Sequence, residues 1–214
     1  MVSEPLLSLA GVVAAVIAMM VDTRGATLVA LVAVAAGLAP TVALTGGGAA
    51  VLVLAIAAVA GVAGAILSRL AARSLPWVAG LDPRVPAFAP SRQLFGPRSL
   101  RAFAAALAIP IASWVSFNVP IGEVAVVQGI LFPIAYVWGC GLLRMVAGRT
   151  VQDLAAGVTM IALSGAAAWL VRGGADAVAG AAAAASLGPL AAVVSGWLAG
   201  RHERRGPAVA DAPG

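Results

Sequence analysis

Lysine is absent from this chain, and histidine, cysteine and tyrosine occur once each. Without lysine there is no Walker-type phosphate loop and no lysine Schiff base. The only histidine, His202, follows the last apolar stretch, so a histidine-ligated metal or haem inside a membrane is excluded. The eight acidic residues are scattered singly, whereas Mg²⁺ sites in membrane transferases need clustered carboxylates. We therefore expect no enzyme activity, no catalytic residues, no metal site and no cofactor.

Charge is also scarce, at 10% of residues against 62% hydrophobic residues and a mean hydropathy of +1.05. Soluble domains carry about 25% charged residues. This composition predicts an all-α, polytopic integral membrane helical bundle whose main surroundings are the lipid bilayer. The formal charge of +5 comes from arginines that lie between apolar stretches. We therefore expect contact with membrane surfaces and not with nucleic acid, the usual partner of a basic soluble domain.

The apolar stretches predict seven transmembrane helices. Residues 26–71 are nearly all apolar, and as one helix at about 1.5 Å per residue they would far exceed a hydrocarbon core of about 30 Å. We expect this segment to fold back at Gly46, Gly47 and Gly48. The predicted spans are 5–21, 26–45, 49–69, 101–118, 121–143, 153–171 and 177–199. The chain thus divides into three helices at 1–71, a Pro/Arg-rich cytoplasmic loop at 72–100, four helices at 101–200 and a cytoplasmic tail at 201–214.

Arginine position predicts the orientation, because cytoplasmic loops carry an excess of basic residues. Twelve of the 13 arginines follow the first, third, fifth and seventh predicted spans, and only Arg172 lies on the other side. We expect an outside N-terminus, a cytoplasmic C-terminus and a multi-pass location in the cell membrane. Thr150 and Asp153 resemble a capping box that opens the sixth span from the cytoplasmic side.

Four polar residues of the fourth and fifth predicted spans and the segment joining them are candidates for a solute path: Asn118, Glu123, Gln128 and Tyr136. Alternatively, Glu123 is a carboxylate at a favourable helix N-terminus. The other side chains would then make interhelical hydrogen bonds worth about 0.6 kcal/mol each. Both interpretations stay open at this point.

Two further groups of residues are candidates for contacts with other molecules. Four arginines near the 72–100 loop form a possible docking or lipid-binding surface: Arg84, Arg92, Arg98 and Arg101. Ala192, Gly196 and Gly200 follow one another at four-residue spacing on the seventh span, which favours close helix packing within the chain or between subunits.

The sequence favours a non-catalytic integral membrane subunit or assembly component of a larger membrane complex. Missing catalytic groups, the expected absence of a buried charge, small-residue helix faces and an arginine-rich loop all point that way. Its partners would be other membrane subunits or further copies of the chain. The alternative is a small permease or channel for an uncharged or weakly polar solute, with a path along the fourth and fifth spans.

Overall fold

The structure of the protein is a computed structural model. It describes residues 4–21, 24–74, 97–118, 124–147 and 151–204. All regular structure in these ranges is α-helical, as the sequence predicts. The helices are α1 (Glu4–Met20), α2 (Arg24–Ser74), α3 (Pro97–Asn118), α4 (Val124–Ala147), α5 (Val151–Arg172) and α6 (Ala177–Arg204). The predicted loop at 72–100 is trimmed at both ends, because α2 continues to Ser74 and α3 begins at Pro97.

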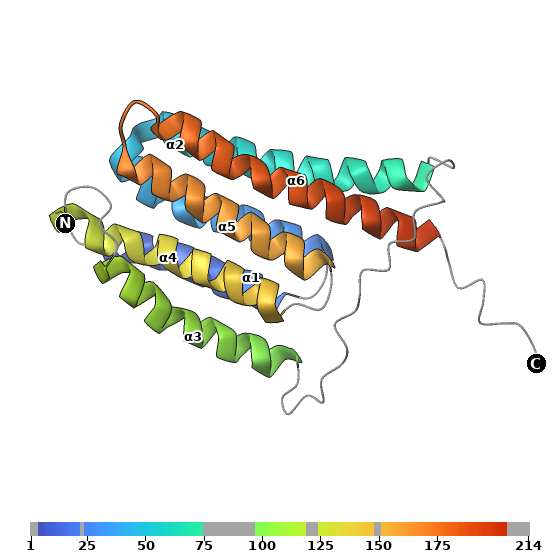
Figure 1. The fold of residues 1–214 in the computed structure, drawn as a ribbon, viewed down its shortest axis with the longest axis horizontal. Helices are drawn as coiled ribbons and strands as arrows, with labels where there is room; N and C mark the ends of the chain where they lie inside the picture. Colours follow the sequence, from blue (N-terminus) through green and yellow to red (C-terminus); the bar gives the residue numbers. More distant parts are fainter. Residues whose placement is uncertain (1–3, 22–23, 75–96, 119–123, 148–150, 205–214) are drawn as a thin grey trace, which may run out of the picture.

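The helices run side by side, in two layers in Figure 1, with α4, α5 and α6 in front of α1 and α2. α3 packs against α4 and, less extensively, against α1, at one edge of the bundle. α5 contacts α2, α4 and α6, and 67% of its apolar span is buried within the protein. This makes α5 the central helix and α3 a peripheral one.

α2 contains two apolar stretches, Gly25–Ala43 and Gly48–Leu67, within one continuous helical segment of 51 residues. In Figure 1 its first half runs towards one end of the bundle and its second half runs back. The helical assignment includes Gly46, Gly47 and Gly48, where the sequence predicted a turn. The change of direction therefore occurs without a separate loop.

Five stretches of the described residues are long and apolar enough to cross a membrane: Gly25–Ala43, Gly48–Leu67, Ser99–Asn118, Asp153–Arg172 and Ala177–Leu198. Two shorter apolar helical stretches, Leu9–Met20 and Leu131–Ala147, accompany them. Many large apolar side chains point outward, among them Val146 at 78% and Phe117 at 72% exposure. Apolar surface on this scale is untenable in water and is normal for helices that face lipid.

Glycines and alanines let the helices approach closely. A Cβ atom added at Gly37 of α2 would lie 2.9 Å from the Ala10 carbonyl oxygen and the Gly11 Cα of α1. A Cβ added at Gly141 of α4 would lie 2.9 Å from the Gly157 carbonyl oxygen of α5. Because both distances are below a normal carbon contact, these two crossings require glycine.

The predicted packing face on α6 lies partly inside the bundle. Ala192 is 5% exposed, and Gly196 is also buried. On the same stretch of α6, Val193 lies against Gly64 of α2. Gly200 lies on α6, and its immediate surroundings fall outside the description. This part of α6 therefore packs within the chain.

Candidate functional site

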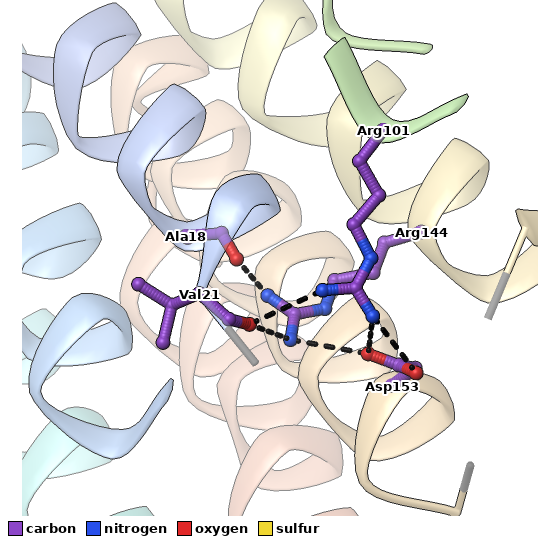
Figure 2. Close-up of polar contacts among 5 residues, drawn as sticks. All are labelled: Ala18, Val21, Arg101, Arg144 and Asp153. Atoms are coloured by element: carbon purple, nitrogen blue, oxygen red, sulfur yellow. Dashed lines mark hydrogen bonds and ion pairs between the residues drawn. The ribbon is translucent and has the colours of Figure 1, made fainter. Parts of the chain in front are cut away.

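The most polar part of the described bundle is a cluster of three charged side chains at the ends of helices. Arg101 comes from the start of α3, Arg144 from the last turn of α4 and Asp153 from the first turn of α5. They meet at the C-terminal end of α1, beside Ala18 and Val21 (Figure 2). We call Arg101, Arg144 and Asp153 the charge cluster.

Asp153 binds both arginines. Its Oδ1 lies 3.2 Å from Nη2 of Arg144 and 3.2 Å from Nη2 of Arg101, and the latter nitrogen also lies 3.4 Å from Oδ2. The side chains of Asp153 and Arg144 are 7% and 1% exposed. A buried carboxylate is tolerated only when it is paired and hydrogen-bonded. The two guanidinium groups are both the ionic partners and the hydrogen-bond donors of Asp153.

The arginines also cap α1. Arg144 donates hydrogen bonds to the carbonyl oxygens of Ala18 and Val21, the second at 3.2 Å. Arg101 donates to the same Val21 oxygen at 3.5 Å. The last carbonyl groups of a helix have no partner within it, and they form the negative end of the helix dipole. Cationic donors at this end therefore satisfy orphan acceptors and interact favourably with the dipole.

The helix dipoles favour two charges of the cluster in their own helices as well. Arg144 sits at the negative C-terminal end of α4, and Asp153 sits at the positive N-terminal end of α5. The chain positions this pair locally, since the two residues are nine apart across the connection between α4 and α5. The sequence placed Arg144 beyond the end of its span at residue 143. The structure corrects this, because α4 continues to Ala147 and turns the guanidinium inward.

Of the four candidates for a solute path, Asn118 and Tyr136 have described side chains, and these bond to carbonyl groups at different points of α3. Asn118 is exposed at the end of α3, and its Nδ2 donates to the Trp114 carbonyl oxygen at 2.8 Å. Tyr136 is 2% exposed inside the bundle, where its hydroxyl donates to the Ala105 carbonyl oxygen of α3 at 3.0 Å. Its ring stacks with Phe132, with centroids 6.1 Å apart. Gln128 lies on α4 with its side chain outside the description, and Glu123 lies outside the described residues.

Of the four candidate docking arginines, Arg101 is the one whose side chain is described. Arg101 points into the charge cluster, and its side chain is 14% exposed. Arg98 lies in the first turn of α3, with its side chain outside the description. Arg84 and Arg92 fall outside the described residues. The docking prediction therefore stays a prediction for the loop, whereas Arg101 is engaged within the bundle.

Tyr136 offers a direct test of whether a polar side chain serves packing. We expect Tyr136→Phe to lower the free energy of unfolding by about 0.6 kcal/mol, a typical value for a hydrogen bond between membrane helices. The measurement is reversible unfolding in mixed detergent micelles. Ser186→Ala is the matched control, because that exposed hydroxyl bonds to the Ala183 carbonyl of its own helix. Equal stability of the two variants would contradict a packing role for Tyr136.

Within the described ranges, no group of three His, Cys, Asp or Glu residues is placed to hold a metal ion. Comparisons of the chain with protein-family models, with curated proteins and with solved structures find no match. The role of the charge cluster is therefore inferred from the contacts that its own residues make. It joins the ends of α1, α3, α4 and α5, and its groups bind one another and the backbone.

Proposed function

We propose that this protein is a non-catalytic integral membrane subunit or assembly component of a larger membrane complex. The observation that supports this most is that the polar side chains named below bind other groups of the chain itself. Hydroxyl and amide groups on the apolar helices bond to backbone carbonyls, and the charge cluster bonds to itself and to α1. The donors are Ser116, Asn118, Tyr136, Thr159, Ser164, Ser186 and Ser195. Most of these bonds close within one helix, whereas the Tyr136 hydroxyl reaches α3 and the Thr159 hydroxyl also lies 3.4 Å from the Gly188 carbonyl oxygen of α6. Polar groups that bind the chain itself agree with a structural role.

The proposed topology has seven spans, an outside N-terminus and a cytoplasmic C-terminus in the cell membrane. Its support lies in the grouping of helix ends. In Figure 1 one side of the bundle contains the ends of α1, α4 and α6 and the starts of α3 and α5. Arg101 and Arg144 belong to this side, whereas Arg172 ends α5 at the opposite side. This arrangement agrees with the positive-inside rule.

The partner would be bound through the 72–100 loop. Part of the small-residue face of α6 is occupied inside the chain. Arg101 is occupied by Asp153. Arg84, Arg92 and Arg98 then remain the candidates for binding an acidic partner surface or an anionic headgroup, and of these Arg84 and Arg92 precede α3.

The test is purification of the tagged full-length chain at native expression level in mild detergent, followed by native mass spectrometry. Stoichiometric heterologous subunits would support the proposal. Replacing Arg84 and Arg92 together by glutamine should remove those subunits, whereas Arg172→Gln should retain them. Arg172 is a suitable control because it lies over the Trp169 ring, 5.1 Å from the centroid, at the other side of the bundle.

A clean homo-oligomer would overturn the complex-subunit proposal and leave the permease as the leading function. Liposome flux of small uncharged solutes would then be measured for the wild type and for Gln128→Leu. A path through α4 predicts loss of flux in the variant at normal expression.

A further inference from the structure

α3 contacts the rest of the bundle mainly through small side chains. Its large side chains point outward: Phe103, Leu107, Ile109, Trp114 and Phe117 are 42–72% exposed. Its buried residues are small: Ala104, Ala105, Ala108, Ala112 and Ser116. Between membrane helices the hydrophobic effect supplies no driving force, so association depends on packing contacts and hydrogen bonds. Alanines let α3 approach α4 closely, and polar contacts with other helices add to this packing.

Polar contacts that join α3 to other described helices lie near its beginning. Arg101 binds Asp153 of α5 and the Val21 carbonyl at the end of α1. One turn further along, the Ala105 carbonyl accepts the Tyr136 hydroxyl of α4. In the second half of α3, the Ser116 hydroxyl and the Asn118 amide bond to carbonyls of α3 itself.

Arg101 is the outer member of the charge cluster, and its acceptors are shared. Arg144 also binds Asp153 Oδ1 and the Val21 oxygen, and it lies deeper, with 1% side-chain exposure against 14% for Arg101. If Arg101 withdraws, Asp153 therefore keeps a cationic partner and the Val21 carbonyl keeps a donor. Since Arg101 is the more exposed arginine, we expect loss of its ion pair to cost less stability than loss of the Arg144–Asp153 pair.

We propose that α3 is the detachable helix of this bundle and that the Arg101–Asp153 ion pair is its latch. Release of the latch moves the beginning of α3 away from the ends of α1 and α5. The Arg144–Asp153 pair holds α4 and α5 together throughout. This motion does not depend on which partner the protein has.

The test is a distance measurement by pulsed electron paramagnetic resonance on the full-length chain in lipid nanodiscs. Spin labels are placed at Ala102 of α3 and Leu154 of α5, which are both exposed. A reference pair at Leu67 of α2 and Val194 of α6 reports on the rest of the bundle. Cys140, which is fully buried, is replaced by alanine in every sample to leave only the introduced thiols.

We expect Arg101→Gln to shift the Ala102–Leu154 distance distribution to longer values and to broaden it. The Leu67–Val194 distance should stay unchanged, and Arg172→Gln should change neither distance. An unchanged Ala102–Leu154 distance in Arg101→Gln would overturn the latch. Equal broadening of both pairs would also overturn it, because the ion pair would then stabilise the whole bundle and not α3 in particular.

Discussion

Asp153→Asn is expected to destabilise the folded protein by about 3–5 kcal/mol, the usual cost of removing one partner from a buried ion pair. The substitution keeps the shape of the side chain and removes its charge. It leaves the Arg144 guanidinium, which is 1% exposed, without the carboxylate 3.2 Å away. The change also removes a negative charge from the N-terminal turn of α5, where the helix dipole favours one.

The measurement is the melting temperature of the purified protein in detergent, which should fall by roughly 10 °C for a chain of this size. Asp176→Asn is the matched control, because this exposed acid lies between α5 and α6, away from the charge cluster. The double variant Arg144→Met with Asp153→Leu should recover part of the loss, because apolar residues of similar size replace the buried charges. Similar melting temperatures for Asp153→Asn and Asp176→Asn would show that the cluster does not stabilise the fold.

Gly157→Ala is expected to force α4 and α5 apart and to cost about 1–3 kcal/mol, the range for overpacking a tight interior. A Cβ atom at this position would lie 2.6 Å from the Gly141 carbonyl oxygen. Backbone cannot move aside as the end of a flexible side chain can, so the two helices must shift. The same shift would disturb the connection that sets Arg144 against Asp153.

Gly61→Ala provides the control for Gly157→Ala, because no other heavy atom lies within 4 Å of a Cβ built at Gly61. Alanine there removes a helix-interior glycine, which favours the folded state by up to about 1 kcal/mol. Unfolding free energies in mixed micelles should therefore change in opposite directions for the two variants. Equal effects would mean that the α4–α5 crossing is not a close contact in the membrane.

Hydropathy predicts the helices of this chain well, because a segment that crosses a membrane must be long and apolar whichever helices pack against it. The predicted span at 153–171 matches α5 (Val151–Arg172), and that at 101–118 lies within α3. Helix ends are less predictable, since polar residues near a membrane surface are compatible with either helix or loop. The end of α4 shows this, because it extends beyond the predicted end at residue 143 to Ala147.

The charge cluster was not predicted, although its residues were noticed separately. The expectation that the chain has no buried charge was wrong, because Arg144 and Asp153 are both buried. Arg101 was interpreted as a docking residue, Arg144 as a loop charge and Asp153 as a helix cap. Their meeting depends on which helix ends are neighbours, and hydropathy does not contain this information. One signal was present: Arg144 and Asp153 are nine residues apart with opposite charges on either side of a short connection between spans. Opposite charges so placed favour pairing across a helical hairpin.

The alanine-rich interior changes what kind of variation this protein tolerates. Alanine has no side-chain rotamers to lose on burial, so ordering the core costs little conformational entropy. Fully buried positions such as Ala15, Ala108 and Ala166 also have no side chain beyond Cβ to truncate. In many soluble proteins a core is damaged mainly by removing atoms. At these alanine positions a saturation scan should instead find the damage in added atoms, because a larger side chain must displace its neighbours.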